Sequence, residues 1–144
     1  MGRSRRDPGD GIGKQDIYEV WGDIVEDAAE KHEAVIYAIL EYLENSGLAE
    51  FFRCETVEAR EDKRPFITLR WDEMIADIDA RPFGSHLDVY IILGLKRGLL
   101  DTPDPSMRIA NLTGWQRRDL QLFQTILKQA IESSLVALDD GLLL

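Results

Sequence analysis

The chain has 144 residues, a length typical of one domain, and its 44% hydrophobic and 8% aromatic content excludes an intrinsically disordered protein. Its formal net charge of −10 opposes nonspecific binding to nucleic acid, because such binding depends on Lys and Arg that neutralise phosphates. The single cysteine, Cys54, cannot form an internal disulfide, and no apolar run approaches the roughly 18 residues of a membrane-spanning helix. We therefore expect a cytoplasmic protein with one hydrophobic core.

Residues 1–14 combine glycines and a proline with basic residues and lack hydrophobic periodicity. This composition predicts a flexible basic arm. Its bases Arg3, Arg5 and Arg6 are candidates for contact with a partner. Residues 11–14 lack the preceding strand and the spacing of a phosphate-binding loop, so we predict no nucleotide site there.

Residues 16–46 are predicted to form a long N-terminal helix, because apolar residues recur every three or four positions. The apolar face consists of Ile17, Trp21, Ile24, Ala28, Val35 and Ile39. The opposite face carries an acidic stripe of Glu19, Asp23, Glu26, Glu30 and Glu33. We interpret this stripe as solvated or partner-facing, since di-metal bundles need a Glu–His pair at i, i+3 and Ala29 stands three residues before His32. Gly22 and the polar residues 30–33 allow a break into two helices.

Strand patterns occupy the middle of the chain. Residues 51–59 and 65–71 alternate about a charged turn, and residues 86–93 show the strongest alternation. Residues 72–81 fit either a short helix or part of an extended hairpin. Residues 94–112 are predicted to form a long loop. Four apolar residues of that loop are candidates for contact with a partner, namely Leu99, Leu100, Met107 and Ile109.

Thr113 and Gln116 have the spacing of a capping box at the start of a C-terminal helix. The predicted apolar face of that helix consists of Leu120, Phe123, Leu127, Ala130, Ser134 and Leu138. Gly141 ends the helix, and the tail residues Leu142, Leu143 and Leu144 are further interface candidates. The predicted fold class is α+β. A small antiparallel sheet of about three to four strands is flanked by a long N-terminal helix and a C-terminal helix, in one domain over residues 15–144.

The densest polar cluster consists of Asp72, Glu73, Asp77, Asp79, His86 and Asp88. His86 and Asp88 share one strand face, which makes them the candidate pair of a small hydrolase. Because Tyr90 and Ile92 lie on the same face, a mixed polar and interfacial surface is the simpler interpretation. No catalytic motif is present, and we predict neither an enzyme nor a bound metal or cofactor.

The order of these elements resembles that of tailed-bacteriophage neck proteins, the tail-terminator and tail-completion group. Four segments carry the resemblance: residues 34–47 as the first helix, 63–69 as a strand that contains a proline, 86–97 as a long strand and 112–138 as the closing helix. The resemblance implies a ring, commonly of six copies, that joins the tail tube to the head. Its partners would be copies of itself and other virion proteins, in the host cytoplasm and then in the virion. An acidic lumen would let DNA pass without binding it.

Two other classes of binding protein fit the same composition. One is an acidic dimeric chaperone resembling those of type III secretion, although these usually place two further strands before the final helix and residues 98–112 contain none. The other is an acidic immunity or inhibitor protein that covers a basic toxin. A ring predicts Leu99 and Leu100 buried between copies, whereas a chaperone predicts a dimer.

Overall fold

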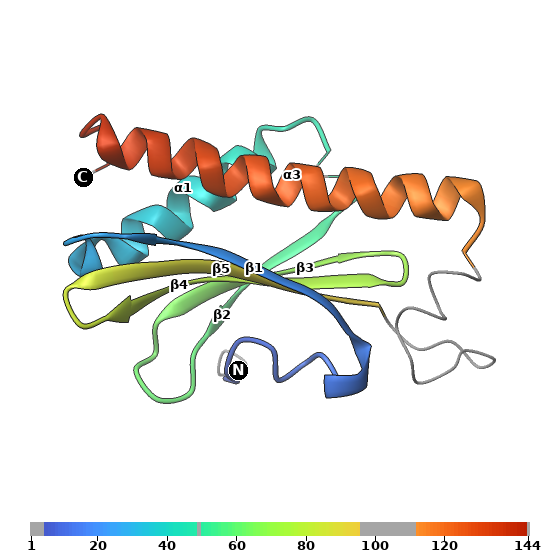
Figure 1. Ribbon diagram of the computed structural model, residues 1–144, viewed down its shortest axis with the longest axis horizontal. Coiled ribbons are helices and arrows are strands. Elements are labelled where there is room, and N and C mark those ends of the chain that lie inside the picture. Colours follow the sequence, from blue (N-terminus) through green and yellow to red (C-terminus); the bar gives the residue numbers. More distant parts are fainter. Residues whose placement is uncertain (1–4, 49, 96–111, 144) are drawn as a thin grey trace.

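The computed structural model describes residues 5–48, 50–95 and 112–143, and Figure 1 shows their arrangement. One antiparallel sheet contains five strands in the order β1-β5-β4-β3-β2. The strands are β1 (Ile17–Val25), β2 (Arg53–Glu58), β3 (Pro65–Trp71), β4 (Met74–Phe83) and β5 (His86–Leu95). Helices α1 (His32–Glu44) and α3 (Gly114–Asp139) cover one face of the sheet. Short 3-10 turns lie at Lys14–Asp16 and Ala29–Lys31. The α+β class is confirmed, with five strands where the sequence predicts three to four.

The prediction of a helix that starts at residue 16 is wrong. Residues 17–25 form β1, which pairs along its length with β5, from Ile17 opposite Gly94 to Val25 opposite Leu87. The helix begins only at His32. A strand is favoured because Trp21 and Val25 pack into the helix-covered core, while neighbouring side chains point to the other face of the sheet.

The acidic stripe is therefore not one helix face. Its members are spread over β1, the turn that follows, the second 3-10 turn and the start of α1: Glu19, Asp23, Glu26, Glu30 and Glu33. Glu19 lies on the helix-facing side of β1, where the amino group of Lys128 in α3 is 3.3 Å from its carboxylate. The five acidic residues therefore belong to different elements and do not form a stripe along one helix.

Residues 72–81 belong to a hairpin and not to a helix. After a turn at Asp72, whose φ is 52°, β4 pairs with β3 on one side and with β5 on the other. Ala76, Ile78 and Ala80 point toward the helices and are fully buried. A second turn contains Gly84, whose φ of 61° favours glycine, and it connects β4 to β5.

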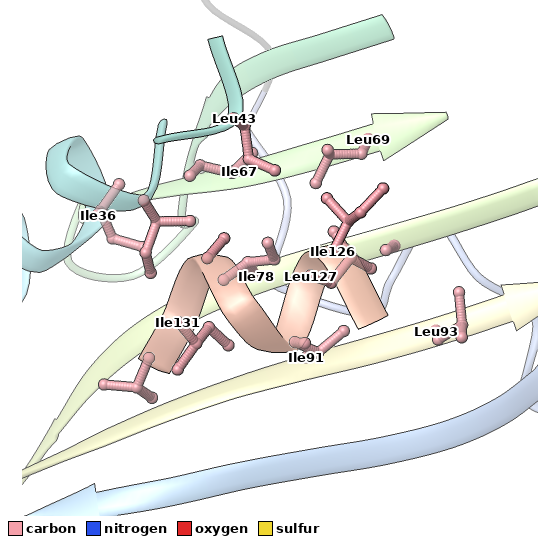
Figure 2. Packing of buried hydrophobic residues seen from close by; sticks show 14 of the residues in the cluster. Ile36, Leu43, Ile67, Leu69, Ile78, Ile91, Leu93, Ile126, Leu127 and Ile131 are labelled. Carbon is pink, nitrogen blue, oxygen red and sulfur yellow. The ribbon is translucent and has the colours of Figure 1, made fainter. Parts of the chain in front are cut away.

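The main core lies between the helices and the sheet, as Figure 2 shows. The capping box of Thr113 and Gln116 is present at the start of α3. The predicted apolar face of α3 is confirmed, because Leu120, Phe123, Leu127, Ala130 and Ser134 are buried, and Leu138 is partly buried against the core. They meet alternate sheet residues that include Ile67, Leu69, Ile78, Ile91 and Leu93. Neither helix, in the described part of the chain, combines the length and apolarity needed to cross a membrane.

The N-terminal segment lies on the other face of the sheet, opposite the helices (Figure 1). Ile12 is buried there against Gly94 of β5, where a Cβ atom would lie only 2.4 Å from the Ile12 side chain. Arg5 makes an isolated bridge to Glu58 at the end of β2. The sequence predicts a flexible arm over residues 1–14, but residues 5–14 contact the sheet because it offers them apolar and charged partners.

Candidate functional site

The sheet face opposite the helices, which we call the open face, carries two buried carboxylates and two surface hollows. Side chains on this face come from alternate positions of all five strands. Residues 5–16 cover its centre, where they contact Phe66, Asp77, Ile92 and Gly94. Two parts of the face stay uncovered, one across β1, β5 and β4 and the other across β2 and β3.

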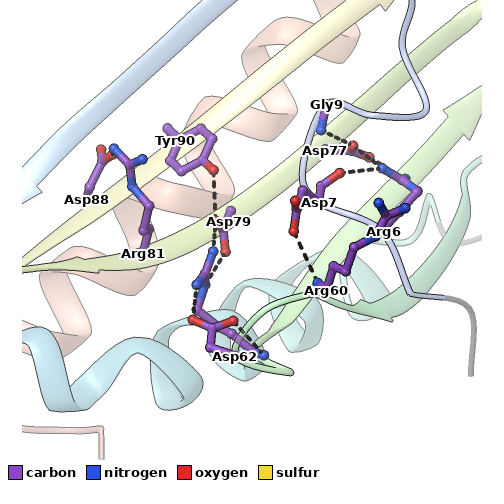
Figure 3. Close-up of polar contacts among 11 residues, drawn as sticks. Arg6, Asp7, Gly9, Arg60, Asp62, Asp77, Asp79, Arg81, Asp88 and Tyr90 are labelled. Carbon is purple, nitrogen blue, oxygen red and sulfur yellow. Dashed lines mark hydrogen bonds and ion pairs between the residues drawn. The ribbon is translucent and has the colours of Figure 1, made fainter.

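A buried carboxylate holds the N-terminal segment in place, as Figure 3 shows. Asp77 is fully buried and accepts two hydrogen bonds from the Arg6 guanidinium, at 2.7 and 3.0 Å, and one from the backbone N–H of Gly9 at 2.8 Å. The hydrogen bond to Asp77 raises the pKa of Arg6, although burial opposes that shift. Arg6 also lies over the Phe66 ring. The structure thus places this predicted interface residue inside the fold, where it fixes the segment.

A second buried carboxylate, Asp79, is also neutralised within the chain. It accepts hydrogen bonds from Nε and Nη2 of Arg64, at 3.1 and 2.8 Å, and from the Tyr90 hydroxyl at 2.8 Å. Arg64 also pairs with Asp62. Burial and the negative charge of Asp79 raise the pKa of Tyr90. Asp77 and Asp79 therefore have all of these hydrogen-bond partners within the chain, and we assign both carboxylates a structural role. The described residues contain no cluster of three or more His, Cys, Asp or Glu that could hold a metal ion.

The candidate hydrolase pair has separate partners. Nδ1 of His86 accepts a hydrogen bond from the backbone N–H of Asp27 at 3.2 Å. The Asp88 carboxylate pairs with Arg81 at 2.9 Å. Asp88 lines a surface hollow, and His86 is not among the residues that line it. The geometry therefore does not support a catalytic role for His86 and Asp88.

The hollow beside Asp88 is the centre of an exposed apolar surface. We call this surface the β1 patch, and it consists of Val20, Gly22, Asp23, Ile24, Arg81, Phe83, Asp88 and Tyr90. The hollow measures about 410 Å³. Val20, Ile24 and Phe83 are 62%, 63% and 64% exposed, values that are unusual for large apolar side chains grouped together. The patch thus combines three exposed apolar side chains with the charged side chains of Asp23, Arg81 and Asp88.

An arginine is held at the middle of the β1 patch. Figure 3 shows Arg81 beside Asp88 and Tyr90. Its guanidinium lies 5.8 Å from the ring centroids of both Phe83 and Tyr90. Gly22 lies opposite Tyr90, and a Cβ atom at Gly22 would be 2.8 Å from the Tyr90 Cβ and 2.9 Å from the Val89 backbone oxygen, so β1 approaches β5 too closely here for a side chain. An arginine within cation–π distance of aromatic rings and close to aliphatic residues is typical of protein–protein interface centres.

Sequence reasoning misses the β1 patch because it assigns residues 17–25 to a helix. The β-branched Val20 and Ile24 were the available signal, since such residues favour strands. Arg81 and Asp88 could not be joined to them, because strand pairing alone brings these segments together.

The remaining predicted interface residues are scattered. Arg5 is exposed and pairs with Glu58 at 3.5 Å. Leu142 is exposed, whereas Leu143 packs partly against the core. The others lie outside the described residues: Arg3, Leu99, Leu100, Met107, Ile109 and Leu144. The expectation that Leu99 and Leu100 are buried between copies therefore stays a prediction.

Comparison with protein-family models, curated proteins and solved structures found no match to this chain. The fold and the β1 patch describe an α+β protein with an exposed interface-like surface on an edge strand.

Proposed function

We propose that this chain is a structural assembly protein that associates with copies of itself through the β1 patch and forms a ring in the neck of a tailed phage. The observation that carries this proposal is the exposure of Val20, Ile24 and Phe83 around the guanidinium of Arg81. Apolar surface of this kind is stabilised when a partner removes it from water.

The position of the patch favours association along the sheet. β1 is an edge strand, and within the described residues nothing pairs with its outer edge. The unpaired backbone N–H and C=O groups of an exposed edge strand can form hydrogen bonds with a strand of another chain. The second edge strand, β2, lies at the opposite side of the same sheet. Contacts between two different surfaces of one protein generate closed rings when the rotation between copies closes.

Element order and charge also support the proposal. From α1 to α3 the chain runs helix, four strands and helix, which keeps the order of helix, strands and helix in the resemblance to phage neck proteins, with one strand more and with β1 added before the first helix. The net charge of −10 suits a lumen through which DNA moves without binding. The partners of such a ring are copies of this chain, the tail tube and other neck proteins.

Paired substitutions test the role of the patch. In Val20→Thr/Ile24→Thr, both apolar side chains become polar while the β-branched shape that favours a strand is kept. The matched control is Val136→Thr, because Val136 is also exposed, at 59%, but lies on α3. We expect the wild type and the control to share one oligomeric mass by light scattering, and the double variant to have a lower one. A double variant with the wild-type mass would contradict the use of this patch.

A further inference from the structure

The second uncovered part of the open face is a small pocket between β2 and β3. It measures about 270 Å³ and is lined by Arg6, Arg53, Glu55, Val57, Thr68 and Arg70. Arg6 closes one side of it, because its guanidinium is fixed by Asp77 and lies over the Phe66 ring. The docked N-terminal segment therefore contributes a wall of this pocket.

Two arginines face each other across the strand pair in this pocket. Arg53 and Arg70 are register partners, so their side chains leave the same face of the sheet directly opposite one another. Like charges in such a pair destabilise a sheet. Neither arginine has an ion-pair partner among the described residues. In a chain with a net charge of −10, these two positive charges lie together without a bound counter-charge.

A buried hydroxyl group lies at the same place. Thr68 is the next open-face residue to Arg70 along β3, and it is only 9% exposed. Its Oγ1 atom has no hydrogen-bond partner within the described part of the chain. Buried polar groups in folded proteins are nearly always hydrogen-bonded, and an unbonded one calls for an explanation. A ligand in the pocket supplies the missing partner.

We propose that this pocket binds a small phosphate-type oxyanion. The guanidinium groups of Arg53 and Arg70 carry planar sets of N–H donors that match the oxygens of such an anion. The Thr68 hydroxyl donates a further hydrogen bond from the floor of the pocket. Glu55, which is the register partner of Thr68, accepts a hydrogen bond from a hydroxyl group on the ligand. The volume suits free phosphate or a small phosphate monoester and is below the usual range of pockets for larger ligands.

Binding is measured by calorimetry and by amide NMR shifts of the full chain, with inorganic phosphate and glycerol phosphate as separate probes. Chloride at the same ionic strength is the reference, since salt alone screens surface charge. We expect saturable binding with shifts centred on residues 53–57 and 66–70. Binding of the ester alone identifies a small phosphorylated molecule as the ligand, and binding of both probes identifies the phosphate group itself.

Three variants locate the site. Arg70→Gln removes one guanidinium, and Thr68→Val removes the hydroxyl while keeping the side-chain shape. Each is expected to weaken binding about tenfold or more, because hydrogen bonds to a charged group are among the strong ones. Arg118→Gln is the control, since Arg118 is an exposed arginine on α3 and lines neither the pocket nor the β1 patch. Absence of saturable binding by both probes overturns the proposal, as does unchanged affinity in Arg70→Gln and Thr68→Val.

Thr68→Val also gives a readout without ligand. Removing an unbonded buried hydroxyl leaves the variant at least as stable as the wild type in phosphate-free buffer. Added phosphate, compared with chloride at the same ionic strength, then raises the melting temperature of the wild type more than that of the variant, because a ligand that binds more tightly stabilises the folded state more at the same concentration. A variant that phosphate stabilises as strongly as the wild type contradicts the site.

Discussion

Arg6 and Asp77 lie 71 residues apart in the sequence, yet the Arg6 guanidinium donates hydrogen bonds to both carboxylate oxygens of Asp77, at 2.7 and 3.0 Å. Asp77 lies on β4 and is fully buried, so its charge depends on these donors and on the backbone N–H of Gly9. The pair joins the N-terminal segment to the centre of the sheet. It also sets one wall of the proposed oxyanion pocket.

Substitution Arg6→Met tests the strength of this connection. It leaves a buried carboxylate without its cation, and we expect a loss of about 3 kcal/mol in the free energy of unfolding by urea. The double variant Arg6→Met/Asp77→Leu should recover much of the loss, since it leaves no unpaired buried charge. Arg5→Gln is the control and should change stability by less than about 0.5 kcal/mol, because Arg5 is half-exposed in its pair with Glu58. An Arg6→Met protein as stable as the Arg5 control would contradict this role.

Gly94→Ala tests whether residues 5–16 pack closely on the sheet. The new methyl group would meet Ile12 Cγ2 at 2.4 Å and the backbone oxygen of Asp16 at 3.2 Å. We expect a loss of about 1–3 kcal/mol and faster proteolysis of the N-terminal segment, because overpacking pushes the segment off the sheet. Gly114→Ala is the control, since a Cβ atom there meets nothing within 4 Å, and it should be neutral or slightly stabilising. Equal proteolysis of both variants would show that the segment is not packed as described.

Tyr90 provides a pH-dependent test. Burial, followed by the charge of Asp79, raises its pKa above the ordinary value of about 10. The folded protein therefore holds a proton that the unfolded chain loses above about pH 10. The contribution to stability is fully present below that pH and is lost as the pH rises through the folded-state pKa.

Titration of tyrosinate absorbance in the wild type and in Tyr90→Phe isolates this group by difference. We expect the difference curve to have its midpoint above pH 10. The same variant loses the hydrogen bond to Asp79 and should be about 1 kcal/mol less stable at pH 7. A difference midpoint at or below pH 10 would contradict the hydrogen-bonded, partly buried position of Tyr90.

We expect the thiol of Cys54 to react slowly with labelling reagents. Burial, with smaller effects from Glu44 and Glu55, raises its pKa from 9.0 to about 11. At pH 8 the reactive thiolate is then about 100-fold less abundant than in the unfolded chain, so labelling by an aromatic disulfide should slow by about that factor or more. The signal is unambiguous because the chain has one cysteine. Equal labelling rates in native buffer and in urea would show that the group is not buried.

Much of the fold follows from local patterns in the sequence. The capping box of Thr113 and Gln116 and the apolar face of α3 are readable because each depends on residues a few positions apart. The alternation in β3 and β5 is equally clear, since one face of each strand packs against the helices. These elements have one consistently apolar face, and such a face gives a periodic signal.

β1 cannot be recognised from a local pattern, because polar and apolar side chains do not separate onto its two faces in the usual way. Its helix-facing side contains Glu19 as well as Trp21, and its open-face side contains the exposed Val20 and Ile24. The strand alternation is therefore weak, while Ile17, Trp21 and Ile24 happen to fall at helical spacing. Tertiary pairing with β5 overrides this local pattern.

The candidate sites depend on partners that are distant in the sequence. The partner of Asp77 is Arg6, and the Arg81 of the β1 patch meets Val20 and Ile24 only through strand pairing. In the proposed oxyanion pocket, Arg53 and Arg70 come together by the register of β2 with β3. A single sequence carries no signal for these pairings beyond the strands themselves.

Assembly through the β1 patch is tested most directly by native mass spectrometry of the purified chain over a range of concentrations, with negative-stain images of the same samples. We predict a closed ring of one defined copy number that Val20→Thr/Ile24→Thr disrupts and Val136→Thr preserves. A wild-type protein that stays monomeric at every concentration, or forms only a dimer, would contradict the ring.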